Sequence, residues 1–114
     1  MKSAYFAVLA FIVSAPSFAQ DGIPRGLGHP GPNAPHWYDQ NCCNRNDCEA
    51  LEPGAIVPGA KGYEVRYINY AGIVVHDIVP YDSPKVHISK DRDEHGCSGA
   101  SAGTLYCIYI HIGV

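Results

Sequence analysis

The chain has 114 residues, with 8 lysines and arginines against 11 aspartates and glutamates, which gives a net charge of −3 at neutral pH. Binding to nucleic-acid phosphates or to an anionic membrane requires a basic surface, so this composition argues against both kinds of partner. The length suits one small domain, and the five cysteines predict disulfide bonds that compensate for a small core.

Residues 1–19 predict a cleavable signal peptide. Lys2 precedes an apolar run over residues 4–13, and Ser17 and Ala19 supply the small side chains of a cleavage site before Gln20. This run is much shorter than the roughly 20 residues of a membrane-spanning helix, so we expect no integral membrane anchor after cleavage. The mature protein is expected to be periplasmic or secreted.

Residues 20–35 differ in composition from the rest of the chain. They contain four prolines and four glycines and few apolar side chains that could be buried. Such a composition is typical of an extended or irregular arm. Dense apolar sequence begins at His36-Trp37-Tyr38, so we expect the folded domain to span residues 36–114.

The domain is predicted to be all-β or nearly so, because no segment has a convincing helical period. Short strands are expected at residues 48–51, 55–57 and 86–88, and a hairpin over residues 63–79 with its turn at residues 69–72. Residues 91–94 read as a charged turn and residues 97–103 as a small-residue loop. Residues 104–112 are apolar on both faces, which predicts a central or covered strand. The expected fold is a small disulfide-stapled antiparallel sheet or partial barrel.

The five cysteines allow several disulfide patterns, and the sequence does not decide among them. Adjacent cysteines rarely bond to each other, so we expect the N-terminal group to bond to the C-terminal pair. The preferred arrangement joins Cys43 and Cys48 to Cys97 and Cys107, in either order, and leaves Cys42 as the unpaired thiol.

The side chains near this cysteine group are compatible with two kinds of binding site. An unpaired Cys42 with His36 and His95 has the chemistry of a soft metal site, although the spacing matches no established metal motif and no cofactor is predicted. The chain is also rich in aromatic residues, which can form a binding surface or fill the core. A binding surface would use Trp37, Tyr38 and Tyr70.

The sequence contains a distinctive pattern of cysteines and aromatic residues: His36-Trp37-Tyr38, Cys42-Cys43, Asp47-Cys48, Val79-Pro80-Tyr81-Asp82, the segment from Ser83 to Ser89, His95-x-Cys97 and Leu105-Tyr106-Cys107-Ile108-Tyr109. This pattern resembles a set of small exported proteins encoded by alphaproteobacteria and some of their phages, and the resemblance covers roughly residues 37–110. It implies export and the five-cysteine arrangement, and it implies no catalytic residue.

These observations lead to three hypotheses about function. The first is a non-catalytic exported domain that binds an envelope protein, a glycan or a second copy of itself. The second is a metal-binding or redox protein that uses the unpaired cysteine and a nearby histidine. The third is a small cell-wall cysteine hydrolase with Cys97 as nucleophile, which the sequence supports weakly because no helix precedes or follows that residue.

Overall fold

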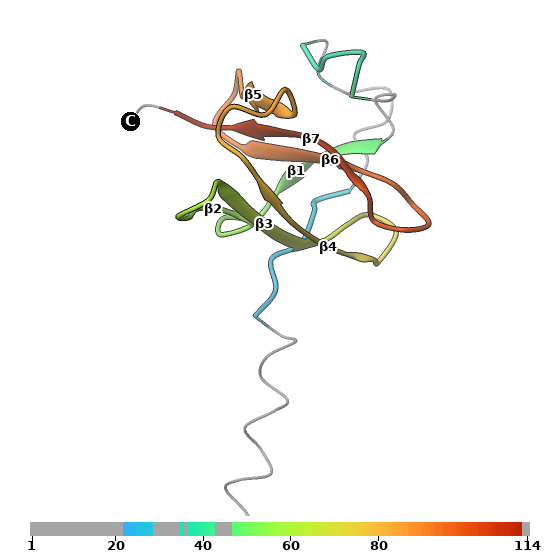
Figure 1. The fold of residues 1–114 in the computed structure, drawn as a ribbon. Coiled ribbons are helices and arrows are strands. Elements are labelled where there is room, and N and C mark those ends of the chain that lie inside the picture. Colours follow the sequence, from blue (N-terminus) through green and yellow to red (C-terminus); the bar gives the residue numbers. More distant parts are fainter. Residues whose placement is uncertain (1–21, 29–34, 36, 43–46, 113–114) are drawn as a thin grey trace, which may run out of the picture.

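The computed structural model describes residues 22–28, 35, 37–42 and 47–112. These residues form seven strands in two sheets, which lie one above the other in Figure 1. The small sheet has the order β2-β3-β4 and the large sheet the order β1-β6-β7-β5. The strands are β1 (Cys48–Leu51), β2 (Ile56–Pro58), β3 (Tyr63–Ile68), β4 (Val74–Val79), β5 (Val86–Ile88), β6 (Glu94–Ser98) and β7 (Leu105–Ile110). The all-β prediction is confirmed, and within the described ranges no helix is long and apolar enough to cross a membrane.

The small sheet is built on the predicted hairpin. Strands β3 and β4 pair antiparallel from Tyr63 opposite Val79 to Ile68 opposite Val74. The alternation in sequence places Val65 and Tyr67 in the core and leaves the intervening polar side chains exposed. Asn69 fixes the turn, because its side-chain oxygen accepts hydrogen bonds from the amides of Ala71 and Ile73 at 2.9 and 3.0 Å.

The large sheet places β7 between β6 and β5. Strand β7 is antiparallel to β6 and parallel to β5. One face of β7 packs against the small sheet through Ile108 and Ile110, and Cys107 and Tyr109 belong to a second buried cluster. The prediction of a central or covered strand is therefore confirmed, because β7 is apolar on both faces and is buried on both.

Strand β6 was not predicted, since its sequence Glu-His-Gly-Cys-Ser resembles a turn and a loop more than a strand. It forms because β1 and β7 pair with it on its two sides. Gly96 is required there: a Cβ at this position would lie 2.6 Å from the hydroxyl oxygen of Tyr67. Gly96 lowers the strand propensity of this segment, but its lack of a side chain allows the buried Tyr67 to pack against the sheet.

The first described residues, drawn in blue in Figure 1, rise from below the small sheet toward β1 and join the two sheets. Residues 22–28 run between β3 and β1, with isolated bridges from Arg25 to Ile68 and from Gly26 to Leu51. Backbone hydrogen bonds connect Gly26 N to Ile68 O and Leu27 N to Ala50 O, both at 2.8 Å. Residues 22–28 are thus paired with both sheets, while residues 29–34 and the signal peptide predicted at 1–19 lie outside the described residues.

Two disulfides, Cys42–Cys107 and Cys48–Cys97, connect the N-terminal cysteine group to the last two strands. The expectation that these two regions are joined is confirmed, but the assignment of Cys42 as the unpaired thiol is wrong. Cys48 faces Cys97 directly in the ladder of β1 and β6, so it takes that partner and leaves Cys107 to Cys42. Cys43, which was expected in a disulfide, lies outside the described residues. Disulfides of this kind indicate an oxidising, non-cytoplasmic environment.

Candidate functional site

Most of the predicted site residues that the structure describes gather on the face of the large sheet turned away from the small sheet. This covered face carries both disulfides and is overlaid by residues 37–42. Strands β5, β7 and β6 contribute His87, Tyr109 and His95, which occupy matching register positions and form a row across the sheet. The row exists because parallel pairing brings β5 beside β7, which no local pattern in the sequence indicates.

Tyr109 is the centre of this row. Its ring stacks on His87 with centroids 4.9 Å apart, and Trp37 and Tyr38 pack against it at 5.3 and 5.2 Å. Its hydroxyl oxygen accepts the amide hydrogen of Asp39 at 2.6 Å and lies 3.4 Å from Cys42 Sγ. Burial raises the pKa of Tyr109, so the hydroxyl stays protonated and has its own hydrogen to direct at the sulfur.

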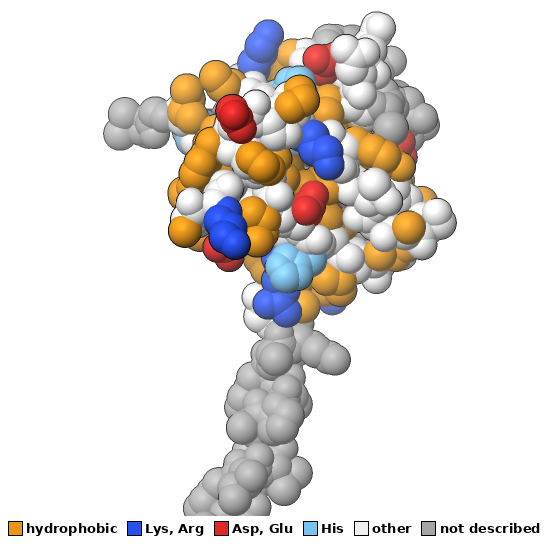
Figure 2. Space-filling view, in the orientation of Figure 1, with side chains coloured by type: hydrophobic (Ala, Val, Ile, Leu, Met, Phe, Trp, Pro, Cys, Tyr) orange, Lys and Arg blue, Asp and Glu red, His pale blue; other side chains and the backbone are white. Residues whose placement is uncertain are grey.

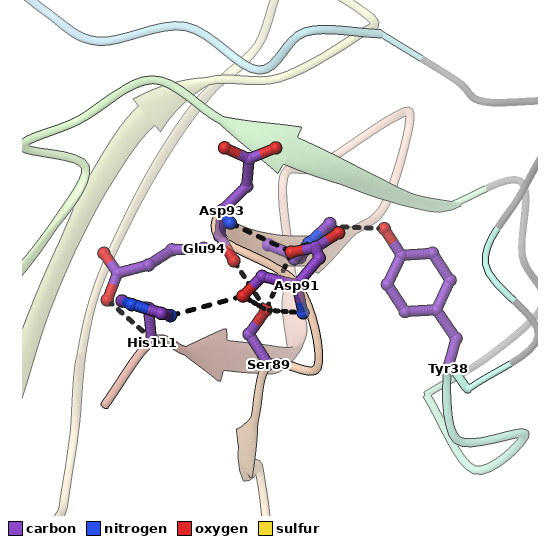
Figure 3. Close-up of polar contacts among 7 residues, drawn as sticks. Tyr38, Ser89, Asp91, Asp93, Glu94 and His111 are labelled. Atoms are coloured by element: carbon purple, nitrogen blue, oxygen red, sulfur yellow. Dashed lines mark hydrogen bonds and ion pairs between the residues drawn. The ribbon is translucent and has the colours of Figure 1, made fainter. Parts of the chain in front are cut away.

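A chain of hydrogen bonds that passes through the buried His95 joins the covering segment to the loop after β5, as Figure 3 shows. Tyr38 lies 2.6 Å from His95 Nδ1, and His95 Nε2 lies 2.8 Å from Asp91 Oδ1. The Asp91 carboxylate accepts the Nε2 hydrogen, and in this tautomer Nδ1 accepts the hydroxyl hydrogen of Tyr38. Burial, together with the charge of Asp91, raises the pKa of Tyr38 well above its ordinary value and keeps it a donor.

Asp91 organises the loop around this chain. Its carboxylate also accepts hydrogen bonds from the hydroxyl of Ser89 and from the amide of Asp93, each at 2.9 Å. Desolvation would raise the pKa of Asp91, but the hydrogen bonds from His95, Asp93 and Ser89 outweigh it and hold the pKa below its ordinary value. The carboxylate is therefore charged, and its Oδ1 accepts all three of these hydrogen bonds, which fixes the conformation of the loop.

A polar pocket of about 280 Å³ lies beside this loop. Glu94 and His111 line it, and the amide of His111 donates to Glu94 Oε2 at 3.2 Å. Burial raises the pKa of Glu94, and the contact from His111 reduces this shift only in part. His111 Nδ1 lies 3.2 Å from the carbonyl oxygen of Asp91 and donates to it (Figure 3). The pair gives the pocket a weakly acidic wall.

A second pocket, of about 420 Å³, opens onto the Cys42–Cys107 disulfide. Its lining includes Cys107, His87 and Lys85. His87 is half-buried and its Nε2 lies 3.5 Å from Cys42 Sγ. Among the described residues, Cys42, Cys107 and His87 are the group whose ligand atoms converge, all within 4.8 Å of one another.

The predicted metal set of His36, Cys42 and His95 does not match this arrangement. Cys42 is bonded to Cys107, and both ring nitrogens of His95 are engaged by Tyr38 and Asp91. His36 lies outside the described residues. The histidine that does face Cys42 is His87, which sequence reasoning missed because β5 reaches β7 only through a non-local parallel pairing.

The three aromatic residues of the predicted binding surface also lie in different places from those expected. Tyr38 is 6% exposed and holds His95, so it is a core residue. Trp37 is partly buried against the same cluster. Tyr70 lies elsewhere, where its hydroxyl contacts Asp47 Oδ1 and the carbonyl of Ser98 at 3.0 and 3.1 Å. The three aromatic residues therefore do not form one exposed surface.

The structure also bears on Cys97, the nucleophile of the hydrolase hypothesis. Its sulfur is bonded to Cys48, and its side chain is fully buried. A disulfide sulfur has no thiolate to attack a peptide bond, so this geometry gives the hydrolase hypothesis no support.

Comparison of the chain with protein-family models, with curated proteins and with solved structures found no match to any of them.

Proposed function

We propose that the protein is an exported binding domain of the periplasm or extracellular space that binds an envelope protein through the outer face of its small sheet. The observation that carries this proposal is the exposure of aliphatic side chains on that face. Val57, Val74 and Ile78 are each about half exposed, at 48%, 50% and 47%. Sheet faces that bury nothing usually carry polar side chains, so exposed aliphatic groups are a sign of an interface.

Charged and polar side chains lie between these aliphatic groups. The register places Glu64 between Val57 and Ile78, and Arg66 opposite His76 on the same face. Figure 2 shows apolar side chains spread between isolated charged ones over the visible surface. Apolar centres with interspersed charges are typical of protein–protein interfaces.

The choice of a protein partner over a glycan follows from where the aromatic rings lie. Ring faces that could stack on a sugar are largely used inside the molecule, as with Tyr38, Tyr67 and Tyr109. The outer face of the small sheet offers aliphatic and charged groups instead, which suit a protein surface. The two disulfides and the signal-like sequence at residues 1–19 support export.

A capture experiment with matched variants tests the proposal. The immobilised mature protein, residues 20–114, is incubated with solubilised envelope proteins, and the bound protein is identified and its Kd measured. We expect Val74→Asp with Ile78→Asp to weaken binding by at least about tenfold. The control is Ile88→Asp, since Ile88 is equally exposed, at 55%, but lies on β5 of the other sheet.

Circular dichroism and a non-reducing peptide map confirm that all variants keep the native fold and disulfides. Loss of the partner in the small-sheet variant, with retention in the Ile88→Asp control, supports the proposal. Equal binding by all three proteins would show that the outer face is not the interface. Concentration-dependent dimerisation that the small-sheet variant abolishes would instead identify a second copy as the partner.

A further inference from the structure

We propose that Cys42, Cys107 and His87 form a binding site for a thiophilic metal ion of the Zn²⁺ class when the Cys42–Cys107 disulfide is reduced. The inference is independent of the proposed binding function, because it concerns the covered face of the large sheet. Its starting point is the convergence of two sulfurs and one ring nitrogen, all within 4.8 Å of one another.

The observed spacing fits a metal centre. Zinc–sulfur bonds of about 2.3 Å and zinc–nitrogen bonds of about 2.0–2.1 Å put a tetrahedral sulfur–nitrogen pair about 3.5 Å apart and a sulfur–sulfur pair about 3.8 Å apart. Cys42 Sγ and His87 Nε2 are already 3.5 Å apart. The Cys107 sulfur lies within 4.8 Å of the same nitrogen. The two sulfurs must separate from bonding distance to nonbonded distance, and a rotation of one cysteine side chain supplies such a movement.

The surroundings hold the three ligands in place. His87 lies on β5 and Cys107 on β7, and these strands are hydrogen-bonded neighbours. Tyr109 stacks on the His87 ring, and its hydroxyl lies 3.4 Å from Cys42 Sγ. The Asp39 amide donates to that hydroxyl oxygen, which directs the hydroxyl hydrogen toward the sulfur. Hydrogen bonds of this kind to the ligands of a metal orient them and increase affinity.

The pocket of about 420 Å³ provides access to the site. Cys107 and His87 both line it, so a metal ion held by the three residues would keep one coordination position toward the pocket. Three protein ligands with one open position are the arrangement of zinc sites that bind water or a small ligand. Two thiolates and an imidazole select zinc or copper(I) over magnesium or calcium.

The redox step is balanced by a dithiol reductant. The reductant donates two electrons and two protons to the Cys42–Cys107 bond, which breaks to give two thiols, while the reductant becomes a cyclic disulfide. Zn²⁺ then binds both sulfurs as thiolates with the neutral His87 nitrogen, and two protons pass to solvent. The Cys42–Cys107 disulfide and the bound zinc ion therefore cannot coexist, so the protein binds zinc only under reducing conditions.

Metal titration of the reduced mature protein tests this inference. The chain carries Cys43→Ser to remove the cysteine that follows Cys42 in the sequence, and a phosphine reduces the disulfide without binding zinc. We expect one Zn²⁺ per reduced chain and none per oxidised chain. X-ray absorption of the zinc complex should show two sulfur ligands near 2.3 Å and one nitrogen near 2.0–2.1 Å.

Variants assign the ligands. We expect His87→Ala to raise the Kd for Zn²⁺ by at least about tenfold, and His76→Ala, an exposed histidine on the other sheet, to leave it unchanged. Zinc binding that survives Cys48→Ala with Cys97→Ala assigns both sulfurs to Cys42 and Cys107. Absence of zinc binding by the reduced chain, equal binding by the oxidised chain, or a coordination shell without two sulfurs would overturn the inference. If a variant fails to fold, the X-ray absorption spectrum of the zinc complex still identifies the ligands.

Discussion

At the scale of single residues, the buried carboxylate of Glu49 connects separate segments of this small domain through hydrogen bonds. Its side chain is fully buried, and its two oxygens accept hydrogen bonds from the amides of Gly28 and Tyr70, both at 3.0 Å. One carboxylate thus connects the arm, strand β1 and the turn of the hairpin. Buried amides without a partner cost roughly 1–3 kcal/mol each, so an acceptor here stabilises all three segments at once.

Replacement of this acceptor should be measurable. Glu49→Gln keeps the size of the side chain but turns one of its two acceptor oxygens into a donor, so the half-buried amide of Gly28 or Tyr70 loses its acceptor. We expect the free energy of unfolding to fall by about 1–3 kcal/mol. Urea denaturation measures it, with Glu52→Gln as control, since Glu52 also accepts an arm amide, that of Arg25, but is exposed. Equal losses in both variants would contradict the role given to Glu49.

At the scale of elements, the segment at residues 22–28 acts as an additional extended piece between the two sheets. It fills the position beside β3 that the short strand β2 does not reach, because β2 pairs only with Tyr63 to Val65. The arm also pairs with the free edge of β1. Covered edges reduce the tendency of a small β-domain to associate edge to edge.

Gly26 is where the arm and Glu49 come closest. A Cβ at this position would lie 2.0 Å from Glu49 Oε1, so Gly26→Ala must displace either the carboxylate or the arm. We expect it to destabilise the protein by about 1–3 kcal/mol, the usual range for overpacking. Leu27→Ala is the matched control in the same segment, because that side chain is 63% exposed, and it should change stability by less than about 0.5 kcal/mol. Thermal unfolding distinguishes the two.

The elements that could be predicted from sequence are those with a local signal. The alternation of Tyr63, Val65 and Tyr67 with polar residues and the two-faced apolarity of β7 each determine a strand by themselves. Strand β6 and the pairing of the arm could not be predicted, because they depend on partners far away in the sequence. The same limit applies to the candidate site: Cys107 and Tyr109 share a face by their spacing of two, but His87 joins them only through tertiary pairing.

At the scale of the whole molecule, two disulfides tie the N-terminal part to the C-terminal strands. They connect residues separated by 65 and 49 positions. Long closed loops restrict the unfolded chain strongly, and the dependence on length is logarithmic. The two bonds should therefore contribute similar amounts to stability although their loops differ in length.

Paired alanine variants test this expectation. Cys42→Ala with Cys107→Ala, and Cys48→Ala with Cys97→Ala, should each reduce the free energy of unfolding by about 4 kcal/mol. Guanidinium denaturation gives both values, and each variant serves as the control for the other. A non-reducing peptide map of the unmodified chain should yield the Cys42–Cys107 and Cys48–Cys97 peptides. A Cys97–Cys107 peptide, or a loss below about 1 kcal/mol in either variant, would contradict this account.

The central position of β7 in the large sheet has a consequence for the order of events while the chain is made. Strand β7 is the last of the seven described strands along the chain, yet it lies between β6 and β5 and carries the partner of Cys42. The small hairpin of β3 and β4 can form as soon as its residues emerge, because its contacts are local. The large sheet cannot form until β7 is available, and until then Cys42 has only incorrect partners, whereas Cys48 can already meet Cys97 of β6.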